Sequence, residues 1–272
     1  MCGIVTAIAR RNIVPVLLEG LRKLEYRGYD SAGLAVLKDG KLQRLRAVGR
    51  VAELAAQADA THLSAEIGIA HTRWATHGVP SERNAHPHIS AGLAVVHNGI
   101  IENFEALRTQ LRAKGYEFTS ETDTEAIAHL LHDTLKTTPD LFEAVRITLG
   151  QLIGAYAIGV VSEAEPNRAI VARKGSPLLL GIGEDGHYAA SDTAALLQVT
   201  RKVVYLEDGD VAELTLDGYR ITLADGTPVE RPVNISSLSA DAVELGKYRH
   251  YMQKEIFEQP QALGNTLEMI AG

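Results

Sequence analysis

Cys2-Gly3-Ile4-Val5-Thr6-Ala7-Ile8-Ala9 follows directly on the initiator methionine. The segment is apolar and contains isoleucine and valine at close intervals, which predicts a buried β-strand. Cys2 is the only cysteine among the 272 residues, so an internal disulfide and a cysteine-based metal cluster are excluded. If Met1 is removed, Cys2 becomes the first residue of the chain. The start of the sequence therefore predicts a buried strand with a candidate nucleophile at its first residue.

Cys2 carries both groups that nucleophilic catalysis requires. A thiol is intrinsically nucleophilic, but a general base is needed to form the thiolate at neutral pH. A free α-amino group has a pKa of about 7.7–8.0, close to the pH at which a general base works best. An N-terminal cysteine would therefore carry its own base. Alternatively, Cys2 is an inert, small apolar residue, as buried cysteines commonly are.

A second motif, His71-Thr72-Arg73-Trp74-Ala75-Thr76-His77-Gly78, stands at the end of the predicted strand Ile67–Thr72. Arg73 could grip a carboxylate in bidentate fashion. Trp74 could form one wall of a small pocket. The alternative is a surface arginine beside a packed tryptophan.

A third motif, His97-Asn98-Gly99, ends the predicted strand Leu93–His97. An amide side chain and a glycine N–H at one turn can form an oxyanion hole. The same dipeptide is a strong turn signal, so a plain Asn-Gly turn is the alternative interpretation.

The fourth motif, Thr122-Asp123-Thr124-Glu125, matches a capping box at the start of a helix predicted to run to about Leu135. The carboxylate of Asp123 could receive a substrate ammonium group. Alternatively, Asp123 only interacts favourably with the helix dipole.

Metal and nucleotide sites lack support in the sequence. No His-Glu-x-x-His motif and no second ligand pair with zinc-like spacing is present. Gly181-Ile182-Gly183 lacks both the third glycine and the following helix of a dinucleotide-binding loop. We therefore expect no metal and no organic cofactor, although five histidines lie in one stretch: His71, His77, His86, His88 and His97.

Charge and hydropathy narrow the function classes further. The net charge of −7 argues against a nucleic-acid partner, which requires clustered lysine and arginine. No apolar run approaches the roughly 20 residues of a membrane span. The first residues, Met1–Val5, lack the basic region of a signal peptide. We therefore expect a cytoplasmic protein with no membrane partner.

The remaining elements predict an α+β fold, because strands and helices come in blocks rather than in strict alternation. Asn12 can cap a helix that ends near Tyr26, and Glu25–Gly33 reads as a helix end followed by a polar loop and a strand. Further helices are expected at about Phe104–Lys114 and Leu141–Gln151, and short strands at Ala32–Leu37, Ala155–Val161, Ala169–Ala172, Leu178–Leu180, Val203–Leu206 and Val211–Leu214.

The pattern loosens after about Thr215. Tyr219–Glu230 is typical of a hairpin, Asn234–Leu245 is polar and typical of a linker, and Tyr248–Glu258 is a charged helical segment that Pro260 should break. We expect a longer parent protein.

Together, the four motifs resemble class II glutamine amidotransferases, which have an N-terminal nucleophile fold. The matching segments occur in the order found in that family: Cys2–Val5, His71–Gly78, His97-Asn98-Gly99-Ile100-Ile101-Glu102-Asn103, and Thr122–Glu125. The resemblance implies an α+β fold in which two antiparallel sheets are sandwiched between helix layers, a four-layer αββα arrangement.

The resemblance also implies a reaction and residue roles. L-Glutamine would be hydrolysed to glutamate and ammonia through a thioester on Cys2, whose α-amino group would be the base. Asn98 and Gly99 would form the oxyanion hole. The other matching residues would hold the substrate: Arg73 its α-carboxylate, Asp123 its α-ammonium group, Trp74, Thr76 and His77 the pocket and its covering loop, with Arg27 in a supporting role near Cys2.

Two segments resemble members that join this glutaminase half to a sugar-isomerase half. They are Glu25–Gly33 and the tail Tyr248–Ile256. The resemblance implies domains at 2–218 (amidotransferase), 219–246 (hairpin and linker) and 247–272 (start of the segment leading to the isomerase). The absent half would act in cis and use the ammonia to convert fructose 6-phosphate to glucosamine 6-phosphate, and the full-length enzyme would be a homodimer.

Two rival interpretations remain. The chain could be an amidotransferase of the same fold that feeds phosphoribosyl diphosphate, which Tyr26–Gly33 and Met252–Ile256 argue against. It could also be a non-catalytic ligand-binding or metal-binding domain, which would keep its function after Cys2→Ala.

Overall fold

The computed structural model describes residues 2–75, 78–237, 248–249, 252–260 and 263. The chain divides into two compact units, residues 1–237 and 238–272. In the second unit, residues 252–260 are helical, and Pro260 is the last residue of this run. Residues 261 and 262, where the expected break of the helix would follow, lie outside the described residues. Within the described residues, no helix combines the length and apolar character that crossing a membrane requires.

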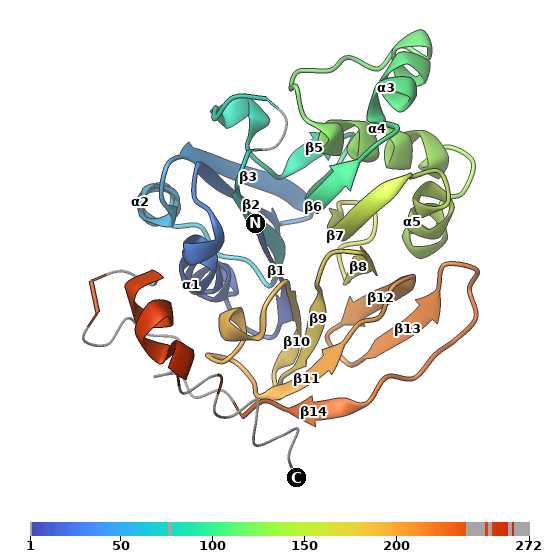
Figure 1. Ribbon diagram of the computed structural model, residues 1–272. Helices are drawn as coiled ribbons and strands as arrows, with labels where there is room; N and C mark the ends of the chain where they lie inside the picture. Colours follow the sequence, from blue (N-terminus) through green and yellow to red (C-terminus); the bar gives the residue numbers. More distant parts are fainter. Residues whose placement is uncertain (1, 76–77, 238–247, 250–251, 261–262, 264–272) are drawn as a thin grey trace. The chain divides into compact units, whose positions relative to one another are not determined.

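Two antiparallel sheets form the centre of the first unit (Figure 1). The eight-stranded sheet has the order β14-β11-β9-β10-β1-β4-β2-β3, and the six-stranded sheet has the order β13-β12-β8-β7-β6-β5. The strands of the larger sheet are β1 (Gly3–Ala9), β2 (Ser31–Lys38), β3 (Lys41–Val48), β4 (Ile67–Arg73), β9 (Leu179–Ile182), β10 (Gly186–Ala190), β11 (Lys202–Tyr205) and β14 (Val233–Ile235). Those of the smaller sheet are β5 (His88–Ser90), β6 (Leu93–Ile101), β7 (Gly154–Ser162), β8 (Arg168–Lys174), β12 (Asp210–Thr215) and β13 (Tyr219–Leu223).

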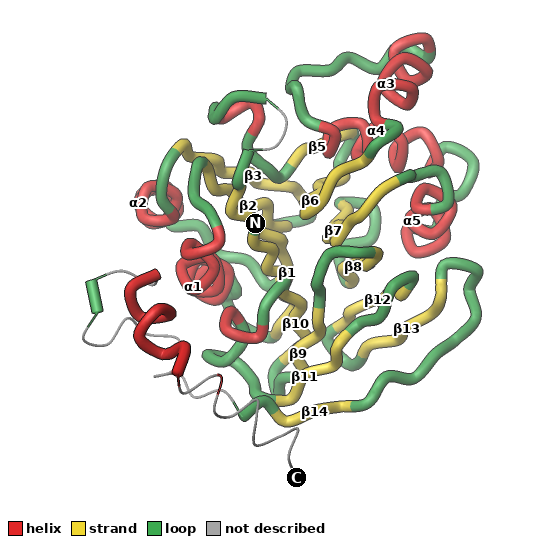
Figure 2. The backbone as a smooth tube through the Cα atoms, viewed as in Figure 1, coloured by secondary structure: helices red, strands yellow, loops and turns green. Residues whose placement is uncertain are grey.

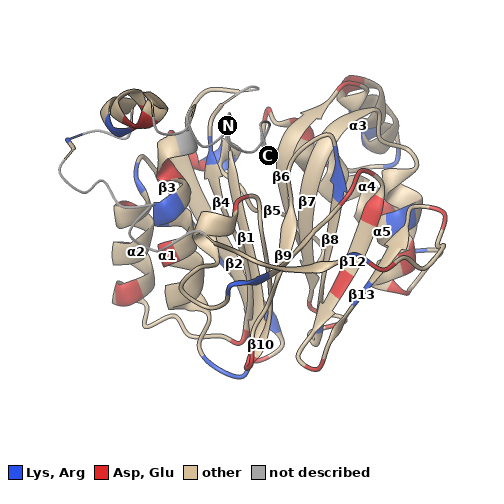
Figure 3. Cartoon of the chain, turned by 60° about the horizontal axis from the view of Figure 1, so that its bottom comes forward, with Lys and Arg blue, Asp and Glu red and all other residues tan. Residues whose placement is uncertain are grey.

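Helices cover the outer face of each sheet (Figures 2 and 3). The larger sheet is covered by α1 (Val14–Leu24) and α2 (Val51–Ala60), which contact β1 to β4. The smaller sheet is covered by α4 (Asp123–Leu135) and α5 (Leu141–Leu149), and α3 (Phe104–Ala113) packs on α4. Three short 3₁₀ helices complete the unit: η1 (Glu25–Arg27), η2 (Glu82–Asn84) and η3 (Thr193–Ala195). The expected αββα sandwich is confirmed.

Strand β1 is apolar apart from Thr6, because both of its faces are buried. Val5 and Ala7 pack into the core beneath α1 and α2. Ile4 and Ile8, which point to the opposite face, pack into the core between the two sheets. The sequence of β1 therefore matches its place in the interior of the sandwich.

The predicted Asn-Gly turn is wrong. Strand β6 runs through Asn98 and Gly99 to Ile101, and Gly99 pairs with Tyr156 of β7. Gly99 has φ of +130°, which an L-residue rarely adopts. Glycine is therefore needed here for an irregular backbone conformation within the strand, and not for a turn.

The predicted capping box does not form either. Thr122 is the N-cap of α4, but its side chain makes no capping hydrogen bond, and its Oγ1 lies 2.9 Å from His88 Nε2. The Glu125 carboxylate accepts hydrogen bonds from the backbone N–H groups of Thr119 (2.9 Å) and Ser120 (2.7 Å). Glu125 therefore binds the loop before the helix and not the backbone N–H of the N-cap residue, Thr122. The N-cap of α1 is Ile13 and not the expected Asn12, although Asn12 Oδ1 accepts a hydrogen bond from Val14 N (3.1 Å).

Apart from β14 and the 3₁₀ helices, four of the described elements have no counterpart in the sequence-based expectations. They are β3, α2, β5 and β10. Strand β3, Lys41–Val48, is mostly exposed or half-buried and lies at the edge of its sheet, so it lacks the apolar pattern of a buried strand.

The end of the first unit belongs to the two sheets. Strand β13 pairs with β12, and a turn follows in which Leu223 N donates to Thr227 O (2.8 Å). Strand β14 pairs with β11, so the first residues of the expected linker are strand. Residues 238–247, the remainder of that linker, lie outside the described residues.

Candidate active site

The start of β1 and the end of β4 bring Cys2 beside the arginine motif. These strands are antiparallel neighbours, and Gly3 pairs with Thr72. The pairing places Cys2 next to the residues that follow Thr72, and Trp74 N donates a hydrogen bond to Cys2 Sγ (3.2 Å). Trp74 is 59% exposed, so this residue lies at the surface beside Cys2.

Asn98 approaches Cys2 from the other sheet. Its Nδ2 donates a hydrogen bond to the carbonyl oxygen of Cys2 (3.1 Å). Its Oδ1 lies 3.0 Å from His71 Nε2. The side-chain amide therefore lies between β1 and β4 of one sheet while its backbone belongs to β6 of the other.

Gly99 is required by its surroundings as well as by its backbone angle. A Cβ added there would lie 2.0 Å from the carbonyl oxygen of Ala155 on β7. No side chain fits at that distance, so only glycine allows β6 to approach β7 so closely at the site.

Asp123 is the first residue of α4 and is only 4% exposed. Its Oδ2 accepts a hydrogen bond from Ile101 N (2.9 Å) and lies 3.8 Å from His97 Nδ1. Because Ile101 ends β6, this bond fixes the carboxylate beside the strand that carries Asn98 and Gly99. The partial positive charge of the helix N-terminus also favours an anion here.

Arg73 is the last residue of β4 and is buried. Its Nη2 donates to Gly78 O (3.0 Å), and its Nη1 donates to Val79 O (3.5 Å) and lies 3.7 Å from Asp30 Oδ1. The other oxygen of Asp30 accepts a hydrogen bond from Ala75 N. The guanidinium is thus held in place by backbone carbonyls of its own loop.

Comparison with known proteins shows what this chain is similar to. A family model described as "Glutamine amidotransferase domain" matches residues 71–198. The glutamine–fructose-6-phosphate aminotransferase [isomerizing] of Acidithiobacillus ferridurans is 60% identical over 270 residues, 98% of this chain and 44% of that protein. The chain contains a glutamine amidotransferase domain. The Vibrio cholerae protein of the same name is 56% identical over 269 residues, with the same coverages. The chain thus spans less than half the length of these relatives.

Solved structures show the same fold for the amidotransferase domain. The glutamine phosphoribosylpyrophosphate amidotransferase of B. subtilis, complexed with ADP and GMP, aligns with a TM-score of 0.71 and 27% identity, covering 82% of this chain and 49% of that one. A glutamine aminotransferase class-II domain protein from Silicibacter pomeroyi aligns with a TM-score of 0.56 and 15% identity, covering 82% of this chain and 99% of that one. The expected N-terminal nucleophile fold is confirmed.

The residues of the amidotransferase site surround a hollow of about 20 Å³. A volume of that size holds roughly one water molecule. The hollow is lined by Cys2, Arg73, Trp74, His86, His97, Gly99, Thr122 and Asp123.

The structure brings together most of the residues predicted from the sequence. Cys2, Arg73, Trp74, Gly99 and Asp123 line the hollow, and Asn98 bonds to the Cys2 carbonyl behind it. Thr76 and His77 lie outside the described residues, as does the side chain of Arg27, whose backbone ends η1.

Three lining residues were missed by the sequence-based prediction of the site. His86 and His97 were considered only as metal ligands, and Thr122 only as a helix cap. Within the described residues, no group of three or more histidine, cysteine, aspartate or glutamate side chains is arranged to hold a metal ion. The rings of His71 and His86 instead pack against each other, with centroids 4.2 Å apart.

Burial sets the protonation of the site. Desolvation raises the pKa of the Cys2 thiol, and the hydrogen bond from Trp74 N only partly opposes this effect. Desolvation lowers the pKa of His71 to about 3 and that of His86 well below its usual range, so both rings are neutral near pH 7. The thiol consequently needs a base, and these two histidines do not supply a positive charge.

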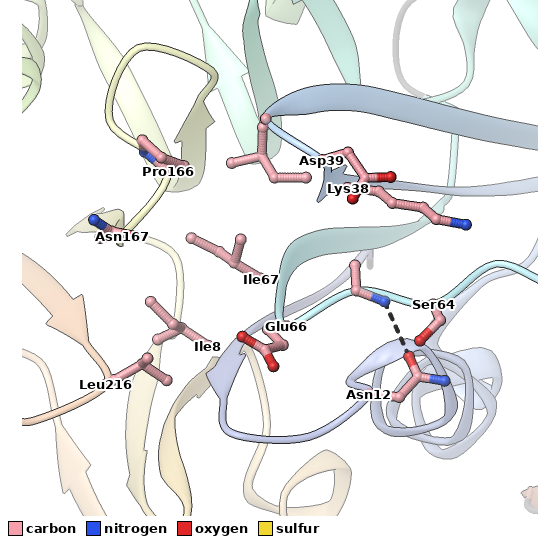
Figure 4. Close-up of a pocket in the computed structure, with 13 residues that line it drawn as sticks. Ile8, Asn12, Lys38, Asp39, Ser64, Glu66, Ile67, Pro166, Asn167 and Leu216 are labelled. Carbon is pink, nitrogen blue, oxygen red and sulfur yellow. Dashed lines mark hydrogen bonds between the residues drawn. The ribbon is translucent and has the colours of Figure 1, made fainter.

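A larger depression of about 450 Å³ lies away from this site (Figure 4). It opens where Ile8 and Ile67 lie, at the far ends of β1 and β4 from Cys2 and Arg73. Apolar side chains form its floor, and Lys38, Asp39 and Glu66 lie around them. None of the predicted site residues lines it, so its size does not indicate the catalytic centre.

Proposed function

We propose that the amidotransferase domain hydrolyses the side-chain amide of L-glutamine with Cys2 as the nucleophile. The observation that carries this proposal is the convergence of a thiol, an amide donor, a glycine at positive φ, an arginine and an aspartate at one hollow built from both sheets. These are the groups that attack on an amide and recognition of an amino acid require.

The first half of the reaction forms a thioester. The α-amino group of processed Cys2 takes the thiol proton, and Sγ attacks the δ-carbonyl carbon of glutamine. Asn98 Nδ2 and Gly99 N donate hydrogen bonds to the resulting oxyanion. The ammonium group of Cys2 then returns a proton to the departing nitrogen, the C–N bond breaks, and ammonia leaves.

The second half cleaves the thioester. Water gives a proton to the same amine and attacks the carbonyl carbon. The C–S bond then breaks, and glutamate and the free thiol are released. Glutamine and water thus give glutamate and ammonia, and every proton transfer uses the Cys2 amine. No metal or organic cofactor takes part.

Arg73 and Asp123 both line the hollow, and their opposite charges would orient the substrate. Arg73 would bind the α-carboxylate after its hydrogen bonds to the carbonyl oxygens of Gly78 and Val79 are broken. Asp123 would bind the α-ammonium group with the carboxylate oxygen that Ile101 N does not occupy. Trp74, Thr76 and His77 would cover the pocket, and Arg27 would support it.

For the whole protein we propose the reaction of the relatives that match almost the entire chain. Ammonia released at Cys2 would pass to a sugar-isomerase domain in cis and convert fructose 6-phosphate to glucosamine 6-phosphate. The proposed domains are 2–218, 219–246 and 247–272, and the proposed full-length enzyme is a cytoplasmic homodimer. Phosphoribosyl diphosphate is the competing acceptor, but the relatives named for fructose 6-phosphate are 54–60% identical over 98% of the chain, against 27% for the B. subtilis enzyme.

The test is glutamate release from L-glutamine, with an intact-mass measurement on the same sample. Protein that lacks Met1 should produce glutamate steadily, and the Cys2→Ala variant should not. Absence of glutamate from correctly processed, folded protein would refute the proposal. The full-length protein should be assayed with each of the two acceptors. Formation of an amino sugar from fructose 6-phosphate, with no product from phosphoribosyl diphosphate, would identify the reaction of the second half.

A further inference from the structure

The imidazole of His71 lies directly behind the Asn98 amide. His71 is on β4 of the larger sheet and is completely buried. Its Nε2 lies 3.0 Å from the carbonyl oxygen of His97 and 3.0 Å from Asn98 Oδ1, both on β6 of the smaller sheet. One ring nitrogen thus contacts two oxygens across the interface between the sheets.

The His97 carbonyl determines which ring nitrogen of His71 carries the proton. A carbonyl oxygen can only accept a hydrogen bond, so Nε2 must be the protonated nitrogen. Nδ1 has no hydrogen-bond partner among the described residues, which suits an unprotonated nitrogen better than a buried N–H. The neighbouring ring of His86, 4.2 Å away between centroids and inclined by 31°, packs on the imidazole and limits its rotation.

The proton on Nε2 in turn determines the orientation of the Asn98 amide. With Oδ1 toward His71, the amide accepts from Nε2–H, and Nδ2 donates to the Cys2 carbonyl at 3.1 Å. In the flipped orientation, the NH₂ group would face the Nε2–H donor, and Oδ1 would face the carbonyl oxygen of Cys2. Both contacts would then be repulsive, so the two neighbours of the amide favour the same orientation.

We propose that His71 is a positioning residue that holds the NH₂ group of Asn98 toward Cys2 and the oxyanion. This inference rests on the proposed function, in which Asn98 stabilises the oxyanion. One amide N–H is bonded to the Cys2 carbonyl, and the other is available to the oxyanion. A 180° rotation would replace this donor with an oxygen acceptor, which would repel the negative charge. His71 therefore acts on the transition state through Asn98 and does not touch the substrate itself.

The first experiment compares three histidine variants with the unmodified protein, all freed of Met1. His71→Leu removes the donor, and kcat for glutamate release should fall about 10- to 100-fold, below the about 10²- to 10³-fold typical of removing an oxyanion donor outright. KM should change little, because Asn98 does not bind the α-groups of glutamine. His71→Gln places an amide N–H near the position of Nε2 and should restore most of kcat.

His187→Leu is the matched control. His187 is also buried, and its Nδ1 also contacts a backbone carbonyl oxygen, that of Thr215 (2.8 Å), but it lies on β10 and does not line the hollow. Its loss should leave kcat close to that of the unmodified protein. Equal losses of kcat in His71→Leu and His187→Leu would mean that any buried histidine matters structurally, and would overturn the proposal.

A double-mutant cycle tests whether His71 acts through Asn98. In an Asn98→Ala background, His71→Leu should lower kcat much less than it does alone, because no amide remains to be oriented. Equal losses in the two backgrounds would overturn the proposal. Circular dichroism of each variant establishes that the folded protein is being compared.

Nitrogen NMR of the unmodified protein, labelled at histidine, gives a readout that needs no variant. His71 should be neutral at pH 7 with the proton on Nε2, and a proton on Nδ1 would overturn the proposal even if no variant folds. The two hypotheses fail differently. Inactivity of the unmodified, processed protein refutes the proposed glutaminase function, whereas an active protein whose kcat is insensitive to His71→Leu refutes only the role of His71.

Discussion

Gly99→Ala should lower turnover strongly, and Gly154→Ala should destabilise the fold without doing so. Gly99 and Gly154 stand on neighbouring strands of one ladder, β6 and β7, and both have φ values, +130° and +126°, that L-residues rarely adopt. An added Cβ would lie 2.0 Å from Ala155 O at Gly99 and 2.2 Å from Ile100 O at Gly154. The two substitutions therefore produce nearly the same clash, but only Gly99 lines the hollow.

The expected loss of stability has two parts. An alanine held at such a φ costs about 1–3 kcal/mol. The clash forces β6 and β7 apart by about 1 Å, and weakening one or two ladder hydrogen bonds costs about 1 kcal/mol each. Each variant should therefore lose about 2–5 kcal/mol of unfolding free energy, a large share of the roughly 5–15 kcal/mol of a typical domain.

The assay pairs urea unfolding, followed by far-ultraviolet circular dichroism, with glutamate release measured per mole of folded protein. Displacement of the Gly99 N–H should lower kcat at least about 100-fold, as loss of an oxyanion donor does. Gly154→Ala should keep most of its turnover at a similar loss of stability. Equal losses of turnover in the two variants would refute the role of the Gly99 N–H, and normal turnover in Gly99→Ala would refute the geometry itself.

Three further outcomes are expected. Protein that retains Met1 should release no glutamate, because the Cys2 nitrogen is then an amide and no base; comparing processed and unprocessed fractions identified by mass tests this. Asp123→Asn should raise KM for L-glutamine about 10- to 100-fold, because a hydrogen bond to a charged group is worth about 1.5–3 kcal/mol. The Oδ1 of the new asparagine can still accept the hydrogen bond from Ile101 N, so the start of α4 should be preserved. An unchanged KM would contradict the assignment of Asp123. Acid should destabilise the fold: His71 and His88 have pKa values of about 3 when folded and about 6.5 when unfolded. The unfolded chain therefore binds more protons between these values, so stability is complete above about pH 6.5 and falls with decreasing pH by up to about 1.4 kcal/mol per pH unit for each histidine. Urea midpoints that do not change between pH 7 and pH 4.5 would contradict this.

The sequence predicts those parts of the fold and site that local chemistry determines. Strand β1 is recognisable because both of its faces are buried and its residues, apart from Thr6, are apolar. Cys2, Arg73 and Asp123 each have an ordinary structural alternative, and they are recognisable because the motifs that contain them together resemble one family. These features require no knowledge of which strands are neighbours.

The missed and mistaken features depend on contacts distant in sequence. Gly99 looks like half of a turn because the sequence does not reveal that Ala155 O lies against it. Glu125 looks like a capping residue because the loop at Thr119 and Ser120, which it actually holds, is not identifiable beforehand. His71 carries no signal of its own, since its significance comes from two acceptors on the neighbouring sheet.

The division of the site between the two sheets explains why polar contacts should connect them behind the hollow. The larger sheet carries Cys2 and Arg73, and the smaller sheet carries Asn98 and Gly99, with Asp123 tied to its β6 strand. Attack requires the sulfur and the oxyanion donors to keep a fixed separation. The apolar core between the sheets is non-directional and does not by itself fix their relative position to that accuracy. Hydrogen bonds are directional, and those from His71 to β6 and from Asn98 to the Cys2 carbonyl both cross the interface. The same contacts that orient the amide therefore also fix the position of Cys2, the proposed nucleophile, relative to Asn98 and Gly99, the proposed oxyanion hole.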